Sequence, residues 1–118
     1  MKTLIFLDDE RHFRDVSWLD YQQEFAMILI YRTAHDFIEA IASLDNLQDF
    51  AFSFDHDLQS YDPDGQEQTG YDCVKALCEL TLQQEWDPKL LQVFVHSKNP
   101  VGRENIEQYV KNFIRHCG

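Results

Sequence analysis

The sequence is short of basic residues, of paired cysteines and of long apolar runs. It has 10 lysine and arginine residues against 21 aspartate and glutamate residues, which gives a formal net charge of −11. Such a surface repels polyphosphate, so broad, non-specific binding of nucleic acid by charge alone is excluded. A small phosphorylated ligand, one nucleic-acid end held in a local pocket, or a protein partner with a basic face remains compatible with this charge.

The cysteine pattern also excludes several classes of protein. Cys73, Cys78 and Cys117 form no C-x-x-C pair, and their number is odd. The chain shows no signal-peptide pattern, so we expect a protein of the reducing cytoplasm. The opening apolar run, KTLIFL, is far too short to span a bilayer, and we expect no membrane segment.

What the chain does contain is enough apolar material for a core. Its 118 residues correspond to about one domain, and we expect a single domain over residues 1–118. A hydrophobic content of 44% with 14% aromatic residues suits a folded globule and argues against disorder. Four apolar runs have the length and composition of buried strands, at residues 3–7, 25–31, 50–54 and 90–95.

Apolar residues at helical spacing lie between and after these runs. Residues 12–24 give a mixed pattern, which we interpret as a crossover with some helix. Residues 59–70 lack apolar periodicity and contain a turn signal at DPDG, so we expect a loop or lid there. Three helices are predicted, with these apolar faces: Phe37, Ile38, Ile41 and Leu44 from about Ala34; Val74, Leu77, Cys78 and Leu82 from about Tyr71; and Ile106, Tyr109, Val110, Phe113, Ile114 and Cys117 in the last.

Strands that alternate with helices predict a three-layer α/β fold, a parallel sheet with helices on both faces. Right-handed connections leave few arrangements, of which the strand order 2-1-3-4 is favoured. In that order the chain reverses direction between strands one and three, which opens a crevice at their carboxyl ends. The polar clusters DDER, DHD and HSKN end strands one, three and four, so we expect them to share one site.

Three carboxylates are predicted to meet at this edge: those of Asp8, Asp9 and Asp55. Their mutual repulsion calls for a cation, and hard oxygen ligands with room for water suit Mg²⁺ or Mn²⁺. The alternative is that Asp9 and Glu10 cap the first helix while Arg11 pairs with one of the acids. We favour the metal site for Asp8 with Asp55, and the cap for Glu10.

Two histidines end neighbouring strands. His56 and His96 are expected about one strand spacing apart, each beside other polar groups such as Asp57. Two imidazoles in this setting favour an acid–base pair or a pair of metal ligands over packed or surface residues. The other histidines lack such a context and are predicted to lie on the surface: His12, His35 and His116.

Phosphate-binding groups are predicted around the start of the last helix. Asn99 as N-cap and Pro100 as first helical residue are a strong helix start. The same start would aim backbone N–H groups at the crevice and could hold a phosphate. Arg11 and Lys98 are candidate anion clamps. Arg103 is a weaker candidate, because it could equally pair with an acid on its own helix.

The motifs LDDER, SFDHDL and HSKNP together resemble those of the cyclic-phosphate-processing receiver domains, a minimal relative of response-regulator receivers found in bacteria and phages. They spread from Leu7 to Pro100. The resemblance implies a receiver-like or flavodoxin-like fold in which Asp8, Asp9 and Asp55 bind Mg²⁺. It matches Ser97 to the hydroxyl residue after strand four. The fifth strand of ordinary receivers, which carries a lysine, is missing, and Lys98 is a candidate substitute.

The resemblance also implies a function. The two histidines are shared with this family, whose proposed role is to process 2′,3′-cyclic phosphate ends of RNA or related cyclic nucleotides. We therefore expect a metal-assisted phosphoesterase. The alternative is a non-catalytic phospho-acceptor or ligand-sensing module that acts through a partner protein; the histidines favour catalysis. The expected catalytic residues are His56, His96, Asp55 and Asp57, and the expected phosphate-binding residues are Arg11, Ser97, Lys98 and Asn99.

Overall fold

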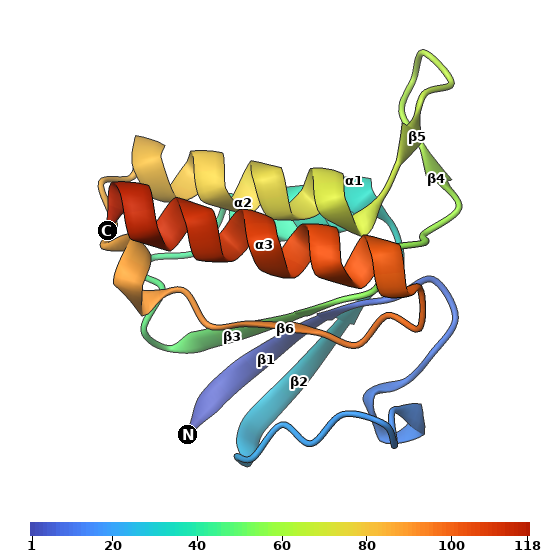
Figure 1. Ribbon diagram of the computed structural model, residues 1–118, viewed down its shortest axis with the longest axis horizontal. Coiled ribbons are helices and arrows are strands. Elements are labelled where there is room, and N and C mark those ends of the chain that lie inside the picture. The colour runs from blue at the N-terminus through green and yellow to red at the C-terminus, as the bar shows by residue number, and fades with distance from the viewer.

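The computed structural model describes residues 1–118 and contains a four-stranded parallel sheet at its centre (Figure 1). The strands are β1 (Lys2–Leu7), β2 (Phe25–Tyr31), β3 (Phe50–Phe54) and β6 (Val93–Val95). Their order is β2-β1-β3-β6, and all three pairings are parallel. The predicted order 2-1-3-4 is confirmed, since β6 is the fourth predicted strand.

Three helices pack on one face of this sheet, above it in Figure 1. They are α1 (Ala34–Ile41), α2 (Gly70–Gln83) and α3 (Pro100–Cys117). Their buried residues form one cluster with the strand residues that point to this side. The strand residues of the cluster are Ile5, Leu7, Phe52, Phe54 and Val95. No helix is both long and apolar enough to cross a membrane.

The opposite face is covered by irregular chain, which corrects the prediction of helices on both faces. The segment 8–24 contains only a 3₁₀ turn, η1 (Phe13–Asp15), and packs Phe13 and Tyr21 against Phe6. Short acidic side chains explain the missing helix. Asp8 accepts hydrogen bonds from two following backbone N–H groups, and Asp15 accepts one from that of His12, so the backbone is satisfied without helical bonds. The third layer is present, but it is not a helix.

Two predicted boundaries are also wrong. The fourth strand does not begin at residue 90, because a 3₁₀ turn, η2 (Pro88–Leu90), precedes β6 and is capped by Asp87. The apolar face of α2 ends at Thr81 rather than Leu82. The Thr81 hydroxyl donates to the Leu77 carbonyl at 2.8 Å and is therefore satisfied in the core, whereas Leu82 is 53% exposed.

The predicted loop at residues 59–70 is instead a small hairpin of β4 (Ser60–Tyr61) and β5 (Glu67–Gln68). The turn expected at DPDG is confirmed. The Gly65 N–H donates to the Asp62 carbonyl at 2.9 Å, and Gly65 takes a φ of 80° that favours glycine. One carboxylate oxygen of Asp62 accepts from two more backbone N–H groups of the turn. A role of this hairpin as a lid remains a prediction.

Gly70 joins the hairpin and α2 to the end of β3. Its N–H donates to the His56 carbonyl at 2.8 Å, and a Cβ on it would lie 1.9 Å from the carbonyl oxygen of Asp55. The obstacle is backbone, which cannot swing aside as a flexible side chain does. Only glycine therefore lets α2 start this close to the polar residues after β3.

We expect Gly70→Ala to destabilise the protein by about 2 kcal/mol or more, because the added methyl group overlaps the backbone of Asp55. Gly65→Ala is the control. It meets no atom within 4 Å and should cost only about 1 kcal/mol through its positive φ. Urea unfolding of both variants measures the difference. Equal losses of stability would show that the contact at Gly70 is not tight in solution.

Candidate functional site

The carboxyl ends of β1, β3 and β6 bring the three polar motifs together, as predicted. Oxygen atoms of Asp8, Asp9 and Asp55 all lie within 4.8 Å of one another. They adjoin a cleft of about 200 Å³ whose nine lining residues include no hydrophobic side chain. The lining residues are Asp9, Glu10, Arg11, Asp55, Asp57, Gln59, Ser97, Lys98 and Asn99.

Asp8 is the most completely buried acid of the cluster, at 0% exposure. One carboxylate oxygen accepts from the N–H groups of Glu10 and Arg11 at 2.9 and 2.8 Å, and the other bonds His96 at 3.0 Å. Burial by itself would raise the pKa of Asp8, but these hydrogen bonds outweigh it and the pKa is lowered. Asp8 is therefore held as a carboxylate.

Asp9 and Asp55 are shifted the other way. Burial and repulsion by Asp8 raise the pKa of both carboxyl groups. Arg11 lies between two of the acids, 3.6 Å from an Asp8 oxygen and 3.8 Å from an Asp55 oxygen, and only partly offsets this repulsion. The expected pairing of Arg11 with an acid is confirmed. The expected capping of a first helix by Asp9 and Glu10 is wrong, because no helix follows.

The cluster fits a hard divalent cation. It offers three carboxylates from two strand ends, and Arg11 is the one cationic side chain that pairs with them. Burial and repulsion by Asp8 raise the pKa values of Asp9 and Asp55. A bound cation would remove that repulsion, and carboxylate oxygens are the ligands that Mg²⁺ and Mn²⁺ prefer. Asp8, Asp9 and Asp55 are the residues that would hold it.

His96 lies behind Asp8, not in the cleft. Its ring is 0% exposed, stacks on Phe6 with centroids 4.2 Å apart, and bonds Ser53 Oγ through Nδ1 at 2.7 Å. The Tyr21 hydroxyl bonds the same Ser53 Oγ at 2.8 Å. We assign Nε2 as protonated, because an ionised Asp8 can only accept. Tyr21 then donates to Ser53, Ser53 to His96, and His96 to Asp8, so every buried polar atom is satisfied.

His56 lies on the other side of the sheet. In the pairing of β3 with β6, Phe54 is opposite Val95, which places His96 opposite Asp55 and His56 opposite the next residue, Ser97. His56 thus stands one residue further along its strand direction than His96. Because successive side chains point to opposite faces of a sheet, the two imidazoles lie on opposite faces. His56 packs against Gly102 at the start of α3, where a Cβ would lie 2.3 Å from its ring. The structure does not assemble the predicted histidine pair.

His56 has a different partner. Its Nδ1 bonds Asp57 Oδ1 at 2.9 Å, and Asp57 also accepts from the Asn99 amide at 3.3 and 3.4 Å. The His56 side chain is 19% exposed, and Asp57 lines the cleft. His56 and Asp57 therefore form a partly accessible pair at the edge of the cleft, linked to the helix start through Asn99.

The start of α3 is built as predicted but offers little to an anion. Asn99 is the N-cap, and its side chain accepts from the Gly102 N–H at 3.1 Å. The Arg103 N–H donates to the Asn99 carbonyl, and Pro100 has none. Within this turn, Val101 alone keeps a backbone N–H without a protein partner. Arg103 pairs with Glu107 at 3.3 Å, which confirms the alternative to a phosphate clamp.

Several residues of this site were missed from the sequence. Trp18 donates its indole N–H to the His96 carbonyl at 2.9 Å and faces both Arg11 and Lys98. It lies in the segment without periodicity, which gave no signal. Ser53 did give one: it is the lone polar residue of the buried run FAFSF and is 0% exposed. A buried hydroxyl needs a partner, and that need could have pointed to His96.

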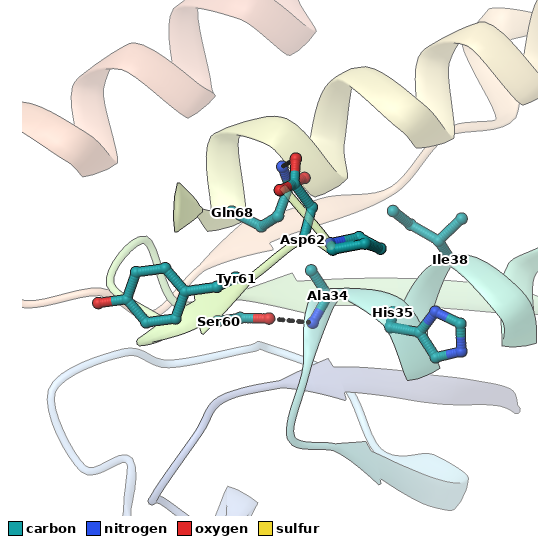
Figure 2. Close-up of a pocket in the computed structure, with 8 residues that line it drawn as sticks. Ala34, His35, Ile38, Ser60, Tyr61, Asp62 and Gln68 are labelled. Atoms are coloured by element: carbon teal, nitrogen blue, oxygen red, sulfur yellow. Dashed lines mark hydrogen bonds between the residues drawn. The ribbon is translucent and has the colours of Figure 1, made fainter. Parts of the chain in front are cut away.

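The largest cavity is elsewhere. Figure 2 shows this pocket of about 580 Å³, between the first turn of α1 and the β4–β5 hairpin. His35 and Ile38 line one side, and Asp62 and Gln68 line another. His35, Asp36 and Glu39 could also gather around a cation, but all three are exposed. No predicted catalytic or phosphate-binding residue lines this pocket, so the smaller polar cleft is the candidate site.

We expect His96→Phe to cost about 3 kcal/mol of stability. The phenyl ring keeps the stack on Phe6, but buried Asp8 and Ser53 lose their partner. Tyr21→Phe removes only the outer hydroxyl and should cost about 1 kcal/mol. Exposed His116 provides the control, and His116→Ala should change stability by less than about 0.5 kcal/mol. Denaturant unfolding at neutral pH measures all three. If His96→Phe cost no more stability than Tyr21→Phe, the hydrogen bonds of His96 to Ser53 and Asp8 would not stabilise the fold as described.

One of three comparisons with known proteins gives a match. Neither the curated proteins nor the solved structures contain a significant one. The sequence profile of the cyclic-phosphate processing receiver domain matches residues 3–112. That span includes the four parallel strands, except for Lys2 at the start of β1, and every residue of the cleft. The chain belongs to the cyclic-phosphate processing receiver domain family.

Proposed function

We propose that the cleft is the active site of a metal-assisted phosphoesterase that processes cyclic phosphates. The observation that carries this proposal is the juxtaposition of three carboxylates, which can hold a divalent cation, with Arg11 and Lys98 in one polar cleft. Acids and cationic side chains side by side suit a ligand that brings both a metal ion and an anionic phosphate.

Mg²⁺ or Mn²⁺ held by Asp8, Asp9 and Asp55 would offset the charge of the phosphate and polarise its phosphorus–oxygen bonds. His96 acts through Asp8: its hydrogen bond fixes the position of that carboxylate and keeps it ionised. His96 itself is completely buried and cannot exchange a proton with a ligand in the cleft. We therefore assign it a positioning role in place of the predicted catalytic one.

The phosphate oxygens are bound by the other polar residues of the cleft. Arg11 and Lys98 supply positive charge, and Ser97 lines the cleft beside them. The Asn99 amide is already shared with Asp57 and the helix start, so its contribution is to fix this part of the cleft and orient Asp57. The cleft of about 200 Å³ admits a phosphate with its ribose edge.

Proton transfer is assigned to His56 with Asp57. The carboxylate of Asp57 orients the imidazole through Nδ1 and leaves Nε2 without a protein partner. Such a pair can take a proton from water and return one to the leaving ribose oxygen, a contribution of roughly 10²–10⁴-fold in rate. In the variant suggested by receiver ancestry, a carboxylate oxygen of Asp55 attacks phosphorus while the ribose oxygen leaves with a proton. Water then hydrolyses the acyl phosphate.

We infer that the ligand is a cyclic-phosphate-bearing nucleotide or RNA end. The net charge of −11 disfavours long contacts with a nucleic-acid backbone, so a single end should enter the cleft. We also propose that the protein works in the cytoplasm and that it can have a protein partner. One assay tests it: purified protein incubated with 2′,3′-cyclic nucleotides and with cyclic-phosphate-ended RNA, in Mg²⁺, Mn²⁺ or EDTA.

The second candidate is a phospho-accepting or ligand-sensing module that acts through a partner. It is favoured by the burial of His96 and by the absence of His56 from the residues that line the cleft. The same assay separates the two functions. Ligand binding without turnover, in every metal tested, would support the sensing module.

We expect Mg²⁺ or Mn²⁺ to raise the melting temperature, because a cation that binds only the folded site stabilises it by linkage. Asp55→Asn should abolish most of this shift, since it removes one of the three charges. Asp36→Asn, in the exposed cluster on α1, is the matched control and should leave the shift unchanged. An equal shift for wild type and Asp55→Asn would remove Asp55 from the metal site.

We expect His56→Gln to lower turnover by roughly 10²–10⁴-fold with little change in ligand affinity, because proton transfer matters in the transition state. His116→Ala is the control, a surface histidine with no contact to the cleft. Rates are measured per folded molecule, with the folded fraction checked by circular dichroism. Unchanged turnover in His56→Gln would mean that the pair with Asp57 is structural.

A further inference from the structure

Trp18 is a large aromatic side chain that belongs to neither buried cluster. It is 37% exposed, on the irregular segment between β1 and β2. Its indole N–H donates to the His96 carbonyl oxygen at 2.9 Å, which ties this segment to the turn between β6 and α3. Ser97 and Lys98, which line the cleft, follow His96 directly. The ring is therefore fixed beside the cleft without lining it.

Two cations lie against this ring. Lys98 Nζ is 4.2 Å from the ring centroid, and the central carbon of the Arg11 guanidinium is 5.1 Å from it. Both distances lie within the range of cation–π attraction. The Lys98 ammonium forms no ion pair with a carboxylate, and the Trp18 ring is the partner over which it lies. The two residues are also the two cationic side chains of the cleft.

An aromatic ring differs from a carboxylate as a partner for these cations. A carboxylate would neutralise them, whereas the ring attracts them through its quadrupole and leaves their full charge available to an anion. It also holds two long, flexible side chains in place before the anion arrives, and this lowers the entropy that binding must overcome. Arg11 lies on the ring while its guanidinium is also 3.6 Å from an Asp8 oxygen and 3.8 Å from an Asp55 oxygen. The ring therefore adds to the ion contacts of Arg11, and it holds Lys98 where no carboxylate does.

We propose that Trp18 is a positioning residue that presents Lys98 and Arg11 to the phosphate as a preformed pair of cations. The proposal rests on the proposed function for the identity of the anion, but the ring–cation contacts are independent of it. Trp18 acts through the two cations and touches no reacting atom.

The test uses inorganic phosphate as probe, with the full chain in Mg²⁺. Calorimetry compares five proteins: wild type, Trp18→Phe, Trp18→Leu, Lys98→Met and the double variant Trp18→Leu/Lys98→Met. Loss of one cation–π contact corresponds to about two- to fivefold in affinity. We expect Trp18→Leu to weaken phosphate binding by about fivefold and Trp18→Phe, which keeps an aromatic face, by no more than about twofold. The double variant Trp18→Leu/Lys98→Met should lose clearly less than the sum of the two single losses, because only the Arg11 contact is left for the ring to support. Additive losses, or equal losses for Phe and Leu, would overturn the proposal.

Fluorescence gives a readout that needs no anion. In a Trp86→Phe background Trp18 is the sole tryptophan, and removing the ammonium group with Lys98→Met should change its emission. Unchanged emission would show that Lys98 does not lie over the ring in solution and would overturn the positioning role alone. If the emission changes but the wild type does not bind phosphate, the proposed function is wrong. Phosphate is then not the anion to which Trp18 presents the two cations.

Discussion

The carboxylate of Asp8 is completely buried at the end of the central strand, and an unpaired charge there would cost several kcal/mol. Four groups from two parts of the chain remove that cost. They are the N–H groups of Glu10 and Arg11, the imidazole of His96, and the Arg11 guanidinium. His96 reaches Asp8 from the sheet face that the helices do not cover, so its other ring nitrogen also needs a buried partner there. Ser53 provides that partner, and Tyr21 in turn bonds Ser53. Segment 8–24, which carries Tyr21, therefore covers this face and completes the hydrogen bonds.

The same arrangement leaves the site incomplete by itself. Satisfying Asp8 so well keeps it ionised, and burial together with the Asp8 charge raises the pKa values of Asp9 and Asp55 beside it. Arg11 compensates part of that charge, but it must also serve the cleft. The protein therefore maintains an electrostatically unfavourable cluster that a bound cation would relieve. Such a local departure from what stability favours is typical of functional sites.

The sequence predicted the parts of this molecule that depend on pattern and failed where tertiary contacts decide. Apolar runs and right-handed crossovers were enough for the strand order, and parallel strand ends were enough to bring Asp8, Asp9 and Asp55 together. The histidines show the limit. Both follow strands, but a register offset of one residue separates them onto opposite faces, and no single-strand pattern contains the register. The layer from residue 8 to 24 was missed for a related reason, since its order comes from side chains that cap the backbone and not from periodicity.

The net charge of −11 constrains what such a cleft can bind. An anionic ligand approaches against the field of the whole molecule, so the favourable potential must be local, within about a Debye length of roughly 8 Å in physiological salt. Arg11 and Lys98 are the positive charges that line the cleft, and a cation on the three acids would add to them. A phosphate that reaches the cleft gains this attraction, whereas the rest of a nucleic-acid chain would lie over acidic surface. Under the proposed function, this charge distribution would favour a terminal phosphate over internal ones without any contact to a base.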